Sequence, residues 1–105
     1  MFFKYSLRSL LSPLFVAITL VSFAQNATIR GFVYDKKNLE SIPSASVSLK
    51  GTKYALATDV NGYFQLSGIA AGNYLLQVTY LGYDTIRLNI KLNPGELITK
   101  KFYLV

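Results

Sequence analysis

Short runs of alternating apolar and polar residues, separated by turn residues, restrict the fold of this chain more than any other feature. The runs at residues 45–50 and 85–92 alternate without a fault. This pattern is typical of β-strands with one buried and one solvated face. Beyond residue 24 no long helical period appears. Turn residues recur about every 8–12 positions, which is the spacing of an all-β sandwich or barrel.

Seven strands are predicted, at residues 28–34, 45–50, 54–58, 63–66, 74–81, 85–92 and 97–105. Successive strands joined by short turns should pair antiparallel, and two sheets packed face to face are favoured over a closed barrel. The strongest hairpin is expected at the turn 59–62, because Asn61 and Gly62 both tolerate positive φ. In the last strand, Phe102 and Leu104 share a face with Lys100, which indicates a bulge or an exposed start near Thr99.

The first 24 residues have the three parts of a secretory signal peptide. Lys4 and Arg8 make a basic start, an apolar run extends from Leu10 to Phe23, and Ser22 and Ala24 are the small residues of a cleavage site. A membrane anchor is the alternative, but the run is shorter than the ~20 apolar residues that a spanning helix needs. We expect cleavage after Ala24, export, and a domain at residues 25–105 without a transmembrane segment.

The chain has no cysteine, which excludes a lipid anchor after the cleavage site and any disulfide. A domain of this size buries only about 60–65% of its unfolded surface, so its stability must come from packing. Most of the eight Tyr and seven Phe residues of the chain lie in this domain and suit the demand, because each ring buries a large area for little rotamer entropy.

Charge and composition exclude several classes of function. Eleven basic residues, of which Lys4 and Arg8 precede residue 25, leave nine against five acidic residues in the predicted domain, a net charge of +4. These cations are spread along the sequence, which does not fit a nucleic-acid-binding face. Without His or Cys no Ser–His, Cys–His or imidazole–zinc site can form, and the acids are scattered. We expect no enzyme activity and no cofactor.

A calcium loop is the alternative reading of the turn 59–62. Calcium takes about six or more oxygen ligands, whereas no further carboxylate follows Asp59 until Asp84. We therefore expect the Asp59 carboxylate to accept hydrogen bonds from the backbone amides of its own turn.

Five pieces of the sequence, in their order and spacing, resemble the carboxypeptidase regulatory-like domain. They cover nearly all of the predicted domain and are Ile29–Asp35, Ile42–Val47 with Lys50–Thr52, Thr58–Leu66, Ala71–Leu76 and Tyr80–Tyr83. The resemblance implies an all-β, seven-stranded antiparallel, transthyretin-like (prealbumin-like) sandwich, also described as a carbohydrate-binding-like fold. It also implies that the domain has no peptidase activity of its own.

In Bacteroidetes, domains of this family typically follow the signal peptide of TonB-dependent outer-membrane receptors. The resemblance therefore implies a non-catalytic accessory domain at the periplasmic face of the outer membrane, whose partner is a periplasmic protein or the rest of the receptor chain. The sequence stops at Val105, where such receptors continue, so it is expected to be a leading piece of a receptor. A free-standing periplasmic or secreted binding module and the leader of another envelope protein are the alternatives. A glycan ligand is possible, but no residue specifies one.

The residues that carry the resemblance mostly have structural explanations. Gly31 lies on the inward face of the first predicted strand, which suggests the close approach of another backbone or a ring. Tyr83 is either a ligand-stacking residue or a tyrosine that packs on the sandwich and donates from its hydroxyl. The full set is Gly31, Asp35, Gly51, Thr58, Asp59, Gly62, Phe64, Gly72, Tyr74, Gly82 and Tyr83, with Gly51, Gly62, Gly72 and Gly82 at predicted turns.

Four outward aromatic residues are the candidate binding patch: Phe32, Tyr34, Tyr54 and Tyr63. If several share a face, they form an exposed aromatic patch of the kind that marks an interaction site. The alternative is that they cover the rim of a small core, and the sequence leaves both interpretations open.

Overall fold

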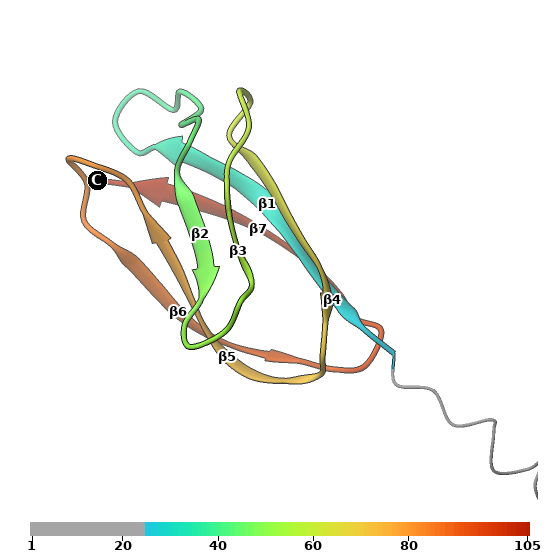
Figure 1. The fold of residues 1–105 in the computed structure, drawn as a ribbon. Coiled ribbons are helices and arrows are strands. Elements are labelled where there is room, and N and C mark those ends of the chain that lie inside the picture. The colour runs from blue at the N-terminus through green and yellow to red at the C-terminus, as the bar shows by residue number, and fades with distance from the viewer. Residues whose placement is uncertain (1–24) are drawn as a thin grey trace, which may run out of the picture.

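Two β-sheets packed face to face make up the domain (Figure 1). The computed structural model describes residues 25–105, and the predicted signal peptide lies outside the described residues. The strands are β1 (Ala27–Asp35), β2 (Ser46–Leu49), β3 (Ala55–Ala57), β4 (Tyr63–Ile69), β5 (Gly72–Thr79), β6 (Ile86–Leu92) and β7 (Leu97–Leu104). The predicted seven-stranded sandwich is confirmed. Residues 25–105 contain no helix that is long and apolar enough to cross a membrane.

The hairpin prediction at the turn 59–62 is wrong, although the turn itself is present. The Gly62 amide donates to the Asp59 carbonyl at 2.9 Å, and the Asp59 amide donates to the Tyr63 carbonyl at 2.9 Å. However, β3 pairs with β2 in the sheet β3-β2-β5-β6, whereas β4 pairs with β1 in the sheet β4-β1-β7. The turn therefore carries the chain from one sheet to the other. The residues of a turn indicate that the chain reverses direction. They do not indicate that the strands before and after the turn pair with each other.

One strand pair departs from the predicted antiparallel arrangement, since β1 and β7 run parallel. Their register is continuous from Thr28 opposite Leu97 to Asp35 opposite Leu104, so no bulge lies near Thr99. The other expectation, an exposed start of the strand, is confirmed, because Leu97 and residues 99–101 are exposed. The antiparallel prediction holds for successive strands that are joined by a short turn. It does not apply to β1 and β7, because almost the whole domain separates them in sequence. Lys100 has inward parity yet is exposed, because β7 is an edge strand with an open side.

The core lies between the sheets and is built from alternate residues of both. The three-stranded sheet contributes Ile29, Val33, Phe64, Leu66, Phe102 and Leu104, and the four-stranded sheet contributes Val47, Leu49, Leu76, Val78 and Leu92. The rings of Phe64 and Phe102 lie 6.1 Å apart between centroids. All of these residues belong to 27–104, so the described part of the chain has a hydrophobic core of its own.

Gly31 marks the closest approach of two backbones in the fold. A Cβ atom added to Gly31 would overlap the carbonyl oxygen of Lys100 on the neighbouring strand β7. The approaching group is thus a backbone and not an aromatic ring. Only glycine allows β1 and β7 to lie this close together at this position.

Candidate interaction face

A row of four aromatic rings crosses the outer face of the three-stranded sheet. Tyr63 of β4 lies opposite Phe32 of β1, Tyr34 follows two positions further along β1, and Tyr103 of β7 lies opposite Tyr34. The centroid distances along the row are 5.2 Å for Tyr63–Phe32, 6.0 Å for Phe32–Tyr34 and 5.6 Å for Tyr34–Tyr103. We call these four residues the aromatic row.

The structure brings together three of the four residues named from the sequence and separates the fourth. Tyr54 lies just before β3, on the other sheet, where it packs against the core and its hydroxyl donates to the Gly68 carbonyl at 3.0 Å. The sequence prediction missed Tyr103. The signal was available, because Tyr103 alternates with the buried Phe102 and Leu104 and must therefore point outward.

The rings of the aromatic row contact one another. Phe32 and Tyr34 are only 15° from parallel, and Tyr34 and Tyr103 are 26° from parallel. The Tyr63 and Phe32 rings are tilted by 58°. At these centroid distances neighbouring rings are in offset or tilted contact, so the four residues form one continuous aromatic row on the sheet.

Two cations and no acid accompany the aromatic row on this face. The outward positions of β1, β4 and β7 include Arg30 and Lys101, and none of them is Asp or Glu. The Arg30 Nε donates to the Thr99 hydroxyl at 3.2 Å, which holds the guanidinium along the sheet. A hollow of about 140 Å³ lies between Tyr34, Leu39, Lys101 and Tyr103, and Leu39 is 65% exposed there.

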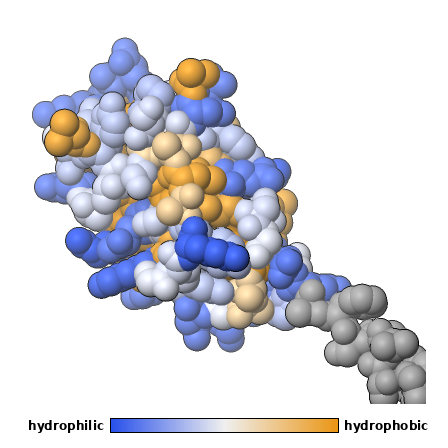
Figure 2. All heavy atoms as spheres, in the orientation of Figure 1, coloured by the Kyte–Doolittle hydropathy of each residue, from blue (hydrophilic) through white to orange (hydrophobic). Residues whose placement is uncertain are grey.

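The opposite side of the sandwich carries no comparable row. Figure 2 shows a mostly hydrophilic face with apolar surface gathered near its middle, over β2 and β3. Neither strand contains an aromatic residue, and Ala55 and Ala57 of β3 are exposed. Leu81, at 94% exposed, and Val60, at 83% exposed, are isolated at loop tips.

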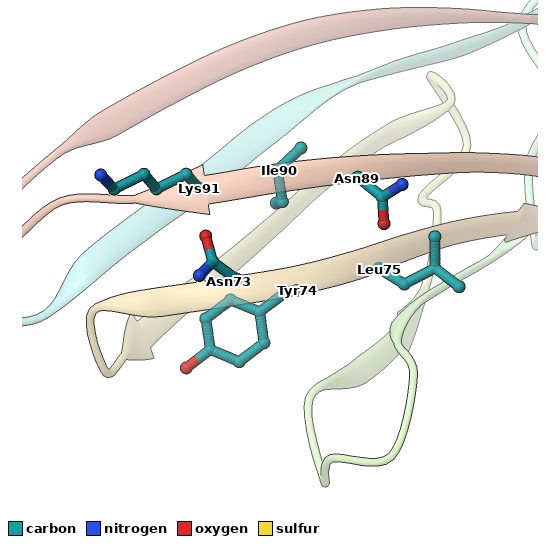
Figure 3. Close-up of a pocket in the computed structure, with 6 residues that line it drawn as sticks. All are labelled: Asn73, Tyr74, Leu75, Asn89, Ile90 and Lys91. Atoms are coloured by element: carbon teal, nitrogen blue, oxygen red, sulfur yellow. The ribbon is translucent and has the colours of Figure 1, made fainter.

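A hollow on the β5–β6 pair offers little chemistry. About 480 Å³ in volume, it is lined by residues of these two neighbouring strands, as Figure 3 shows: Asn73, Tyr74, Leu75, Asn89, Ile90 and Lys91. Successive strand residues point to opposite faces, so these side chains do not converge on a single point. Among residues 25–105 no group of three or more His, Cys, Asp or Glu side chains could hold a metal ion.

Asp35 and Tyr83 form a hydrogen-bonded pair that ties the β5–β6 loop to the end of β1. The Tyr83 hydroxyl donates to Asp35 Oδ2 at 2.6 Å, and the amides of Lys37 and Asn38 donate to Asp35 Oδ1 at 2.7 and 3.2 Å. These hydrogen bonds hold the pKa of Asp35 below its ordinary value of 3.8, and the bond from Tyr83 has the largest effect, followed by those from the two amides. The same bond raises the pKa of Tyr83 above 10.0. Tyr83 therefore has a positioning role, and its hydroxyl is already occupied.

Replacing Tyr83 by Phe should move the pKa of Asp35 upward, toward 3.8. The pair stabilises the fold fully between the unfolded-state pKa values of the two groups, about 3.9 for Asp and about 10 for Tyr. This stabilisation is lost as pH falls through the lowered pKa of Asp35, or rises through the raised pKa of Tyr83. A carboxyl-carbon NMR titration of wild type and Tyr83→Phe measures the shift. An Asp35 titration curve unchanged by the substitution would show that the bond does not form in solution.

Thr58 acts as a buried clamp on the loop before β2. Its hydroxyl accepts from the Ala45 amide at 2.9 Å and donates to the Ile42 carbonyl at 2.7 Å, and Thr58 is only 5% exposed. Asp59 next to it accepts from the amides of Asn61 and Tyr63 at 2.9 and 3.0 Å. The side-chain oxygens of Thr58 and Asp59 thus form hydrogen bonds with backbone groups. Both residues therefore have a structural role, in holding the turn and the loop before β2.

Thr58→Val should destabilise the domain by about 2 kcal/mol, because it keeps the shape but leaves a buried amide and a buried carbonyl without their partners. Ser46→Ala, on the exposed face of β2, is the control and should stay within about 0.5 kcal/mol of wild type. Urea unfolding monitored by tyrosine fluorescence gives both values. Equal midpoints for the two variants would contradict the clamp.

The remaining motif residues also have structural positions. Phe64 is 1% exposed in the core, and the Tyr74 hydroxyl donates to the Ala70 carbonyl at 2.6 Å. Gly72 begins β5 beside the Tyr74 ring, and Gly51 and Gly82 lie in the turns after β2 and β5. None of these five residues faces the aromatic row.

Comparison with known proteins gives a consistent picture. Residues 29–104 match the CarboxypepD_reg-like domain family. The chain is 34% identical over 83 residues to the TonB-dependent receptor SusC of Bacteroides thetaiotaomicron, an alignment that covers 79% of this chain and 8% of the receptor. The chain thus spans less than a tenth of the length of this curated relative.

Solved structures support the fold. A chain of a type II cohesin–X-dockerin complex from Acetivibrio cellulolyticus aligns with a TM-score of 0.63 at 21% identity, over 74% of this chain and 56% of that one. A variant of BcpA, the major pilin subunit of Bacillus cereus, aligns with a TM-score of 0.63 at 21% identity, over 76% of this chain and 29% of that one. At these identities the likeness shows the β-sandwich alone.

Proposed function

The chain belongs to the CarboxypepD_reg-like domain family, and from this premise we propose that it is the non-catalytic, N-terminal accessory domain of a TonB-dependent outer-membrane receptor. It lies at the periplasmic face of the outer membrane after export. There it binds a protein partner, either another periplasmic protein or the remainder of the receptor chain. Transport itself belongs to the rest of the receptor.

The similarity to SusC carries this proposal. An identity of 34% over 83 residues extends through almost the whole described domain, while covering 8% of the receptor. A short domain within a much longer receptor has the proportions of an accessory module. The aromatic row supports a binding role, because partly exposed rings gathered on one sheet face are typical of interaction surfaces.

The coding sequence after the codon for Val105, in the intact gene or a close homologue, tests the assignment first. The proposal expects a linker, a plug of about 100–150 residues and then the repeated alternating strands of an outer-membrane barrel. In the complete receptor, removal of residues 25–105 should leave the receptor in the outer membrane and lower nutrient uptake. A gene that ends at Val105 and yields an exported, free domain would refute the receptor assignment and leave the sandwich intact.

A free binding module for glycans is the second candidate, since sugar rings also stack on aromatic side chains gathered on one face. The accessory-domain proposal assigns the aromatic row to a protein partner and gives the domain no glycan ligand. Calorimetry of residues 25–105 with soluble neutral oligosaccharides should therefore show no binding. A Kd tighter than about 1 mM, equivalent to about −4 kcal/mol, would favour the glycan module.

A further inference from the structure

We propose that the aromatic row and its two cations form a docking surface for an acidic segment of a protein partner. The proposal goes beyond the receptor assignment and rests on it only for the expectation that the partner is a protein. The docking surface consists of the aromatic row (Tyr63, Phe32, Tyr34, Tyr103) with Arg30, Lys101 and Leu39. It lies on the outer face of the sheet β4-β1-β7, away from the core.

The electrostatics of the docking surface favour a negative partner. Arg30 and Lys101 place two full positive charges among the outward residues of the three strands, and no Asp or Glu lies among those residues to offset them. The outward side chains of this sheet therefore carry a net positive charge, which attracts a negatively charged partner.

Two carboxylates that flank the sheet are already engaged. Asp35, at the end of β1, accepts from Tyr83, Lys37 and Asn38. Asp59, before β4, accepts from the amides of its own turn. Neither needs the cations of the docking surface as a partner. Arg30 and Lys101 remain available to carboxylates of another molecule, which they can bind with charge-assisted hydrogen bonds.

The hollow between Tyr34, Leu39, Lys101 and Tyr103 adds an anchor point. Its volume of about 140 Å³ accommodates one apolar side chain of the partner. Leu39 supplies an exposed aliphatic wall, and Tyr34, Tyr103 and the cationic side chain of Lys101 complete the lining. A buried apolar anchor beside a charged rim is the usual composition of a protein–protein contact. The expected occupant is thus an acidic segment that carries an apolar or aromatic residue.

Other occupants fit the docking surface less well. A membrane-binding patch usually gathers about four to eight basic residues, whereas this face has two. A symmetric dimer through this face would place the same cations of both copies against each other, which is unfavourable. A neutral sugar chain would leave both cations without a charged partner. The charge of the face therefore favours an acidic polypeptide.

Binding of two short peptides to ¹⁵N-labelled residues 25–105 tests the proposal. One peptide has a phenylalanine between pairs of glutamates, and the other replaces each glutamate by glutamine. At low ionic strength the glutamate peptide should shift the amide signals of the outer residues of β1, β4 and β7, and bind about tenfold more tightly than the glutamine peptide. Anionic phosphatidylglycerol vesicles and soluble neutral oligosaccharides are the competing probes.

A pair of charge-reversed variants localises the effect. Arg30→Glu combined with Lys101→Glu should weaken the binding of the glutamate peptide by about tenfold. Arg87→Glu combined with Lys91→Glu makes the same change in net charge on the exposed face of β6 and should leave the affinity unchanged. Retained amide dispersion shows that each variant is folded.

Several results would overturn the docking surface. They are equal affinities for the two peptides, no binding of the glutamate peptide, equal losses in the two double variants, and tighter binding of vesicles or oligosaccharides to this face. Dimerisation through this face would do the same. These measurements use the domain alone, so they can fail while the receptor assignment holds. The gene structure can in turn refute the receptor assignment without changing peptide binding.

Discussion

Gly31→Ala should destabilise the domain by about 3 kcal/mol, the largest effect expected of any single methyl group added to this fold. The new Cβ would overlap the Lys100 carbonyl oxygen, and this oxygen belongs to a backbone that cannot rotate away. Accommodation requires β1 and β7 to separate, which strains their continuous parallel register from Thr28 to Asp35. With a total stability of about 4–12 kcal/mol for a domain of this size, the variant should be much less stable and partly unfolded when warmed.

Gly51→Ala is the matched control for Gly31→Ala. It adds the same methyl group where no atom lies within 4 Å, at a φ of +75°. Its cost should therefore be only the backbone term of about 1 kcal/mol. Thermal unfolding followed by circular dichroism at 215 nm, a wavelength sensitive to β-structure, gives both values. A Gly31→Ala variant no less stable than Gly51→Ala would show that β1 and β7 are further apart than the structure has them.

Gly62→Val should cost nearly as much, about 3 kcal/mol, for two reasons that add. Gly62 has a φ of +73°, which a β-branched residue adopts only with strain. A Cβ at this position would also lie 2.6 Å from the Val33 carbonyl oxygen and 3.3 Å from the Ile42 amide nitrogen. Denaturant melts of the two proteins measure the difference.

Lys36→Ala is the control for Gly62→Val, because Lys36 is exposed in the loop after β1. Its midpoint should match wild type within about 0.5 kcal/mol. Gly62→Ala isolates the contribution of β-branching, since alanine keeps both the clash and the positive φ. If Gly62→Val unfolds at the same denaturant concentration as Lys36→Ala, the turn 59–62 does not hold Gly62 at positive φ against the Val33 carbonyl.

The strands were predictable because their signal is local. Each alternating run corresponds to an observed strand whose ends differ by at most three residues from the prediction, and the turn at Gly62 is present. Pairing was less predictable, because it depends on contacts between distant residues. The sequence of the turns does not indicate that β3 and β4 belong to different sheets. It also does not indicate that β1 pairs with β7 in parallel.

The candidate site was predictable in part, for the same reason. Alternation placed Phe32, Tyr34 and Tyr63 on outward positions, but only the pairing of β1 with β4 and β7 brings them into one row with Tyr103. Tyr54 lies just before β3 of the other sheet, which local sequence does not reveal. The role of Tyr83 depends on its contact with Asp35, 48 positions away in sequence. Long-range topology therefore decides which aromatic residues act together.

The most direct test of the central claim is nutrient uptake by cells whose receptor carries a charge-reversed docking surface. Arg30→Glu with Lys101→Glu should lower uptake while the amount of receptor in the outer membrane stays the same, because the domain folds but no longer binds its partner. Arg87→Glu with Lys91→Glu should support wild-type uptake. Equal, undiminished uptake by both double variants would contradict the claim that this domain serves its receptor through the outer face of the three-stranded sheet.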